Sequence, residues 1–116
     1  MAKVLILGGS GMIGTGLAQS LQAAGVAVEV TSRSGDSIDR IPEVAVHQFE
    51  ALADSLAEVL ADLKSGDYVI NCIGMVKSLI NDDDRQSRDR AIFLNATFPS
   101  QLAAVAEVLQ LKVIQM

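Results

Sequence analysis

The sequence predicts a protein of the α/β class, a doubly wound parallel sheet in one domain over residues 1–116. Short apolar runs that end in glycine alternate with amphipathic segments, which is the order of a repeated strand and helix. The chain has three Phe, one Tyr and no Trp, so its core must be built from Val, Leu, Ile and Ala. Strands that are buried on both faces of a parallel sheet have that composition.

The first strand and the first helix are the clearest elements. Residues 4–7 form a continuous apolar run closed by two glycines, which predicts a strand buried on both faces. Ile13, Leu17 and Leu21 then recur every four residues, which predicts an amphipathic helix. Gly25 gives this helix its C-terminal end.

The middle of the chain predicts three more strands and one more helix. Polar turns and glycines delimit the strands, which are expected over residues 26–31, 44–48 and 68–73. A helix over residues 52–63 is predicted because its large aliphatic side chains share one helical face, and Ser65 and Gly66 end it.

The last third predicts a loop, a long helix and a fifth strand. Residues 81–84 read Asn-Asp-Asp-Asp, a solvated loop in which Asp84 is expected to cap the next helix. Their spacing matches no calcium loop, so no metal site is expected there. The helix covers residues 88–109 with Pro99 inside it, and residues 112–116 begin the fifth strand. Right-handed crossovers then give the strand order 3-2-1-4-5, and we expect the chain to be the N-terminal part of a longer protein, truncated after the fifth strand.

Charge and cysteine content exclude several classes of partner. The formal net charge is -5 and no cluster of Lys and Arg is present, which argues against nucleic acid. Cys72 is the single cysteine, so no internal disulfide forms, as expected in a reducing cytoplasm. The N-terminus lacks the pattern of a signal peptide, and no apolar run reaches the roughly 20 residues that span a bilayer. We therefore expect a cytoplasmic protein with no membrane partner.

A glycine-rich turn separates the first strand from the first helix. Residues 8–14 read Gly-Gly-Ser-Gly-Met-Ile-Gly and satisfy both G-x-G-x-x-G and G-x-x-G-x-x-G. One glycine permits the tight turn, Gly11 lets the backbone approach a pyrophosphate, and Gly14 lets the helix pack on the strand. Free N–H groups at the helix N-terminus then face the anion. The pattern predicts a Rossmann-type NAD(P)-binding domain, and a flexible connection without a ligand is the alternative.

The end of the second strand indicates which dinucleotide binds. Ser32 stands where an Asp or Glu would hydrogen-bond the adenosine ribose of NAD. Arg33 follows, and with Ser32 and Ser34 it is predicted to hold a 2′-phosphate, because a guanidinium matches phosphate geometry. NADP(H) is therefore favoured and NAD stays open, while a merely solvated arginine is the alternative. Glu29 lies too early on its strand to be the ribose acid.

The glycine spacing resembles the extended short-chain dehydrogenase/reductase family. Residues 67–74, Asp-Tyr-Val-Ile-Asn-Cys-Ile-Gly, are similar to the fourth-strand motif of that family, and residues 95–109 to its Asn-containing helix. Within the family, the chain is most similar to nucleotide-sugar reductases of the dTDP-4-dehydrorhamnose reductase type. The resemblance covers essentially the whole chain.

The resemblance implies where the cofactor would lie. The sequence departs from the family in two places: Leu7 stands where many members have Thr, and the acid often found after the third strand is replaced around Phe49 and Glu50, which puts the adenine contacts there in doubt. By this resemblance the pyrophosphate would meet Gly8, Gly11, Met12, Ile13 and Gly14, the adenosine phosphate would meet Arg33, the nicotinamide ribose would pass Cys72, Ile73 and Gly74, and Asn95 would lie near the cofactor.

The resemblance also implies an oxidoreductase that transfers hydride between NADPH and the keto group of a nucleotide-linked deoxysugar. The family uses a Ser or Thr after the fifth strand and a Tyr-x-x-x-Lys, but here Tyr68 is followed by Cys72 instead of Lys. The catalytic group is therefore expected beyond Met116, and the 116-residue stretch alone is expected to be inactive. A non-catalytic dinucleotide sensor or scaffold is the alternative, and a methyltransferase would need an acid near Ser32. The oligomeric state stays open, with a homodimer as one option.

Pro99 predicts an irregularity beside Asn95. Proline has no N–H to donate to the carbonyl four residues earlier, which belongs to Asn95. We expect a kink of more than about 20° there, with the released carbonyl holding a water near the cofactor, as in the Asn-centred relay of the resembled family. The alternative is that the helix begins near Pro99.

Overall fold

The computed structural model describes residues 2–74 and 83–116, which are arranged around a five-stranded sheet. All four strand pairs are parallel and the order is β3-β2-β1-β4-β5, so the predicted topology is confirmed. The order reverses between β1 and β4, and in such sheets ligands bind beyond the carboxyl ends of the strands at this point. The strands are β1 (Lys3–Leu7), β2 (Ala27–Ser32), β3 (Ala45–Gln48), β4 (Tyr68–Asn71) and β5 (Lys112–Gln115).

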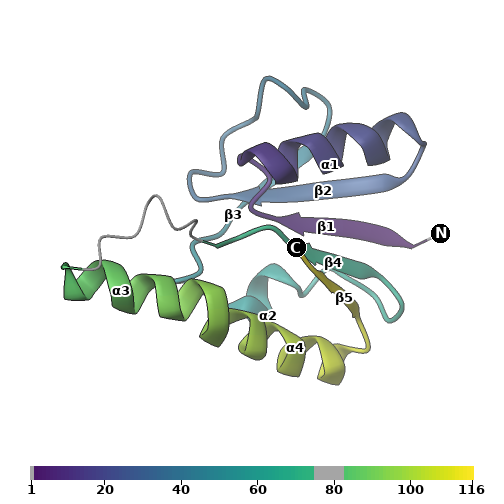
Figure 1. Cartoon of the computed structure of the whole chain (residues 1–116). Coiled ribbons are helices and arrows are strands. Elements are labelled where there is room, and N and C mark those ends of the chain that lie inside the picture. Colours follow the sequence, from purple (N-terminus) through teal and green to yellow (C-terminus); the bar gives the residue numbers. More distant parts are fainter. Residues whose placement is uncertain (1, 75–82) are drawn as a thin grey trace.

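Helices cover both faces of the sheet (Figure 1). One face carries α1 (Met12–Ala23), and the other carries α2 (Leu56–Val59) and a long helical run. That run consists of α3 (Arg85–Ile92), the π-helical turn η2 (Phe93–Thr97) and α4 (Phe98–Leu109). The alternation of side chains along β1 feeds two cores, with Val4 and Ile6 on the α1 side and Leu5 and Leu7 on the α4 side.

The long helical run is anchored in the core by its second half. Phe98, Leu102 and Ala106 are at most 1% exposed and pack against Leu5 and Leu7. By length and composition alone this run would also be able to cross a membrane. Core helices pass the same test, and the buried face of α4 shows that this one is packed on the sheet.

The helix predicted over residues 52–63 is wrong in extent, because α2 has only four residues. Ser55 is extended, at φ −82° and ψ 123°, and its side chain accepts a hydrogen bond from Glu58 N, so the helix begins there. Before it, the carboxylate of Asp54 accepts a hydrogen bond from Glu50 N at 2.7 Å and closes a turn. Side-chain hydrogen bonds to the backbone thus replace the first helical turns that the leucine spacing suggested.

Two other boundaries differ from the prediction for similar reasons. β4 ends at Asn71, two residues earlier than predicted, because the buried Asn71 amide accepts a hydrogen bond from Ile73 N at 3.0 Å and donates to Gln115 Oε1 at 2.9 Å. α3 begins at Arg85, three residues earlier than predicted. The expected cap is confirmed, since Asp84 Oδ1 accepts a hydrogen bond from Gln86 N at 3.0 Å. Part of the predicted loop, residues 81–82, lies outside the described residues.

Pro99 is accommodated by a π turn. Phe98 N donates to the carbonyl of Phe93, five residues earlier, which inserts one extra residue into the helix just before the proline. Pro99 stands at the start of α4, but the helix does not begin there, because Thr97 and Phe98 already have helical φ and ψ and the run is continuous from Arg85. The helical backbone is irregular around Asn95, as expected, whereas the alternative that the helix begins near Pro99 is wrong, because the run starts at Arg85 and continues through the proline. The kink angle and the water at Asn95 stay predictions.

Candidate functional site

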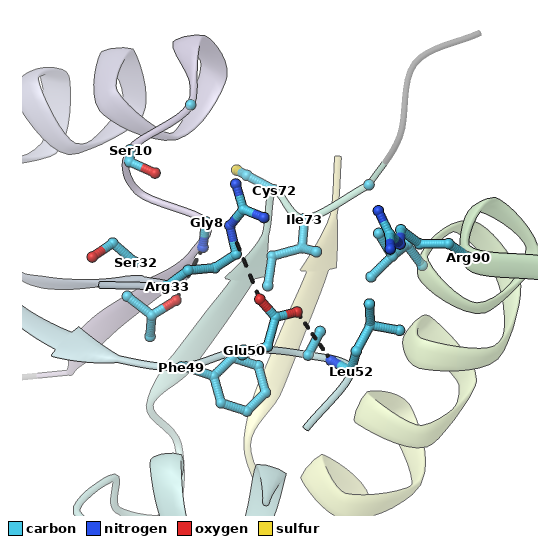
Figure 2. Close-up of a pocket in the computed structure, with 15 residues that line it drawn as sticks. Gly8, Ser10, Ser32, Arg33, Phe49, Glu50, Leu52, Cys72, Ile73 and Arg90 are labelled. Atoms are coloured by element: carbon cyan, nitrogen blue, oxygen red, sulfur yellow. Dashed lines mark hydrogen bonds and ion pairs between the residues drawn. The ribbon is translucent and has the colours of Figure 1, made fainter. Parts of the chain in front are cut away.

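A cavity of about 590 Å³ opens at the carboxyl ends of β1, β2 and β4, where the strand order reverses. Its size is within the range of small-molecule and cofactor sites. Figure 2 shows the glycine turn on one side, the Arg33 and Glu50 side chains across the middle, and Arg90 on the side of α3. The residues that line the cavity come from the glycine turn, the loops after β2, β3 and β4, and the helical run.

Three glycines of the turn are required by the packing of the protein itself. Gly8 has φ +83°, a conformation that side chains rarely adopt. A Cβ on Gly9 would lie 2.4 Å from Val30 Cβ, and a Cβ on Gly14 would lie 2.2 Å from the carbonyl oxygen of Gly8. Gly8 thus makes the tight turn, and Gly14 lets α1 approach the backbone of that turn.

Two buried threonines hold this turn in place. Thr31, at the end of β2, accepts a hydrogen bond from Gly8 N at its hydroxyl, 3.1 Å away, and another from Gly9 N at its carbonyl, 2.7 Å away. Thr15, in the first turn of α1, donates from its hydroxyl to the carbonyl of Gly9 at 2.8 Å. The glycine turn is therefore fixed before any ligand binds.

Gly11 differs from the other glycines of the turn. Its backbone, at φ −76° and ψ 171°, suits any residue, and the nearest atom to a Cβ placed there would be Gly8 O at 3.7 Å. That is an ordinary contact, so the fold does not require glycine here. Gly11 caps α1 without a side-chain hydrogen bond, and the first turn of α1 has no acidic residue. Open space above uncapped helical N–H groups is the arrangement that accepts a phosphate.

The polar residues after β2 form the next part of the wall. Ser32 Oγ accepts a hydrogen bond from Gly35 N at 2.9 Å, and Ser34 Oγ accepts one from Asp36 N at 3.2 Å. Both bonds shape the turn and leave each hydroxyl proton available to donate. The Arg33 side chain is 85% exposed, and its Nε lies 4.0 Å from Glu50 Oε2.

The segment after β4 forms the opposite wall. Cys72, Ile73 and Gly74 line the cavity, and a Cβ on Gly74 would meet Asn95 Oδ1 at 2.9 Å. Asn95, on η2, therefore lies directly behind Gly74. Burial raises the pKa of the Cys72 thiol, so the sulfur is a neutral, weakly polar lining group at neutral pH.

The cavity gathers part of the predicted set. Met12 and Ile13, 85% and 58% exposed, do not line it, and neither do Gly14, Ser34 and Asn95, so any contact from these would come from backbone N–H groups or from beyond the wall. The predicted residues that do line it are Gly8, Gly11, Ser32, Arg33, Cys72, Ile73 and Gly74.

Sequence reasoning missed lining residues from the glycine turn, the end of β2, the loop after β3 and the helical run. Arg90 and Leu94 are four residues apart and thus share a helical face. The sequence shows this spacing, but it does not show which part of the protein that face lies against. The loop after β3 offered no such spacing. The missed lining residues are Ser10, Thr31, Phe49, Glu50, Ala51, Leu52, Arg90 and Leu94.

A parallel sheet of order 3-2-1-4-5 with a fixed glycine turn after β1 defines a Rossmann-type nucleotide-binding domain. Residues 4–116 match the model of the NAD dependent epimerase/dehydratase family, and the chain belongs to this family.

Solved structures share the fold at low identity. An epimerase from Methanothermobacter thermautotrophicus has a TM-score of 0.74 and 21% identity over 98% of this chain and 34% of its own. The Thermus thermophilus UDP-glucose 4-epimerase complex with NAD has a TM-score of 0.75 and 16% identity over 92% of this chain and 34% of its own. The chain thus spans about a third of each of these proteins.

A curated relative is similar over a shorter stretch. Glutamyl-tRNA reductase 1 of Nocardioides sp. is 31% identical over 81 residues, which are 70% of this chain and 18% of that protein.

Proposed function

We propose that this chain binds a nicotinamide dinucleotide, with its pyrophosphate over the glycine turn. The observation that carries the proposal is Gly11, a glycine that the fold does not need and that stands at the uncapped N-terminus of α1. Gly8 and Gly14 explain the shape of the turn, whereas Gly11 is explained by a ligand that approaches the backbone closely.

Each wall of the cavity has a distinct task in this proposal. The N–H groups of the first turn of α1 would hold the pyrophosphate, and Thr15 and Thr31 would keep the turn in position for it. Cys72, Ile73 and Gly74 would provide an apolar surface for the nicotinamide ribose, with Asn95 behind them. When bound, the dinucleotide supplies the hydride exchange, and the protein contributes binding and orientation.

We further propose that NADP(H) is the preferred dinucleotide, with Arg33 pairing the adenosine 2′-phosphate and the Ser32 and Ser34 hydroxyls donating to it. A hydrogen bond to a charged group contributes about 1.5–3 kcal/mol. Arg33→Ala should therefore lower the affinity for NADPH by about tenfold or more and leave the affinity for NADH nearly unchanged. Isothermal titration with both dinucleotides measures this. Arg40→Ala, an exposed arginine outside the cavity wall, is the matched control. An equal loss for both dinucleotides would refute the role of Arg33.

For the whole protein we propose reduction of the keto group of a nucleotide-linked deoxysugar, in the manner of dTDP-4-dehydrorhamnose reductase. The Thermus thermophilus neighbour, named as a UDP-glucose 4-epimerase complex with NAD, supports a nucleotide sugar as the substrate class. Within this chain Tyr68 OH lies 3.5 Å from Lys112 Nζ, but the pair stands at the amino ends of β4 and β5, opposite the cavity. The proton donor is therefore expected beyond Met116.

An NADPH oxidation assay with a nucleotide-linked keto sugar tests whether these 116 residues bind the dinucleotide while the catalytic group lies elsewhere in the protein. We expect the 116-residue chain to bind NADPH without oxidising it, and a longer protein that carries Tyr-x-x-x-Lys to turn over. Turnover by the 116-residue chain would contradict the assignment of the catalytic group. A longer protein that binds NADPH but lacks this motif would instead favour the dinucleotide sensor or scaffold.

A further inference from the structure

Glu50 places a carboxylate at the part of the cavity proposed for the adenosine 2′-phosphate. Its Oε2 lies 4.0 Å from Arg33 Nε, and its Oε1 accepts a hydrogen bond from Leu52 N at 3.3 Å (Figure 2). Its backbone N donates to Asp54 Oδ2 at 2.7 Å, which fixes the loop after β3. The carboxylate is thus anchored at Oε1 by Leu52 N and faces Arg33 with Oε2, and it is 29% exposed, while the arginine is 85% exposed.

No other acid competes with Glu50 for this position among the described residues that line the cavity. The nearby Asp54 is engaged by Glu50 N and by Gln48 Nε2, at 2.9 Å. Glu29 is paired with Lys3 and His47 and does not line the cavity. Glu50 is therefore the acid that meets Arg33.

A carboxylate beside Arg33 acts differently on the two dinucleotides. A phosphate monoester carries about −1.5 to −2 charge at pH 7, so a 2′-phosphate seated on Arg33 would stand next to a like charge and would compete with Glu50 for the guanidinium. The ribose hydroxyl of NAD(H) has no charge at that position, and a carboxylate is able to accept a hydrogen bond from it.

We propose that Glu50 is a specificity-determining residue that limits the preference of this site for NADP(H) over NAD(H). The proposal rests on the proposed dinucleotide site and adds a residue that opposes Arg33 within it. The ratio of the affinities for NADP(H) and NAD(H) then depends on Arg33 and Glu50 together and not on Arg33 alone.

The experiment compares two probes that differ only in the phosphate concerned, adenosine 5′-phosphate and adenosine 2′,5′-bisphosphate. Both are titrated calorimetrically into the purified protein, Glu50→Gln, Arg33→Ala and the double variant. Glu107→Gln is the charge-matched control, because Glu107 is an exposed acid near the C-terminal end of α4. NADH and NADPH titrations accompany each variant.

Glu50→Gln should shift the affinity ratio toward the bisphosphate by about tenfold, the order expected for removing one close like charge at a partly exposed site. The shift should be smaller in the Arg33→Ala background, because part of it comes from releasing the guanidinium from Glu50. It should also be smaller at high salt, because salt screens the repulsion between the carboxylate and the phosphate. A ratio that stays within about twofold, or the same shift with Glu107→Gln, would overturn the role of Glu50 while the site itself stands. If the unaltered protein bound neither NADH nor NADPH, the proposed function would fall, and this inference with it.

Discussion

Replacing Gly11 with alanine should separate the ability to bind from the ability to fold. The new methyl group would have Gly8 O at 3.7 Å as its nearest protein atom, and φ −76° already suits alanine. Alanine is a poorer N-cap than glycine by some tenths of a kcal/mol, and its lower entropy in the unfolded chain offsets this, so stability should change by no more than about 0.5 kcal/mol. The methyl group would, however, occupy the space proposed for the pyrophosphate.

We therefore expect Gly11→Ala to lower the affinity for NADPH by at least about tenfold, or about 1.4 kcal/mol of binding free energy, in a calorimetric titration. Two glycines of the same helix provide controls. Gly14→Ala should destabilise the fold by about 1–3 kcal/mol or more, because its Cβ would lie 2.2 Å from Gly8 O. Gly16→Ala meets nothing within 4 Å and should stabilise α1 by about 0.5–1 kcal/mol without affecting binding. Unchanged NADPH affinity in a folded Gly11→Ala variant would refute the reasoning.

Two further predictions concern the supports of the site and of the sheet. Thr31→Val removes the hydroxyl that accepts a glycine-turn N–H and should lower the free energy of unfolding by about 1–3 kcal/mol in urea titrations, whereas the exposed Thr97→Val should change it by less than about 0.5 kcal/mol. The pKa of Asp67 is lowered because its carboxylate accepts hydrogen bonds from the backbone N–H groups of Lys64 and Lys3, at 2.8 and 2.9 Å. A lowered folded-state pKa adds stability above the ordinary Asp value of about 4 and loses it as the pH falls through the lowered value. Unfolding curves measured from pH 7 to pH 2 should show this loss, and Asp67→Asn should flatten it; an identical pH profile in the variant would contradict the assignment.

Sheet order and the glycine turn were predictable because their signals are local. Residues 4–7 and 68–73 are largely apolar runs that are each closed by glycine, and once each strand is placed, right-handed crossovers leave few topologies. The helix over residues 52–63 was not predictable in the same way. Its aliphatic spacing was correct for a helix, but Asp54 and Ser55 use their side chains to hydrogen-bond the backbone, and those bonds delay the start of the helix and leave it short.

The site was predictable only where one short segment contributes it. Gly8, Gly11 and Arg33 belong to motifs with a known spacing from a strand end. Glu50 and Arg90 come from other segments and meet the same cavity because parallel strands bring their carboxyl ends to one edge. Which side chain faces which across that edge depends on the turns after β2 and β3, and their hydrogen bonds cannot be deduced from spacing.

The distinction between the glycines also bears on the choice between an enzyme and a scaffold. A protein that kept this fold without binding a dinucleotide would still need Gly8 for its positive φ and Gly14 for the approach of α1. Those two residues therefore support the fold and say little about a ligand. Gly11, and Arg33 with its exposed guanidinium, have no comparable structural requirement, so they are the positions where binding and folding make different demands. Binding tests at these two positions therefore address the proposed function directly.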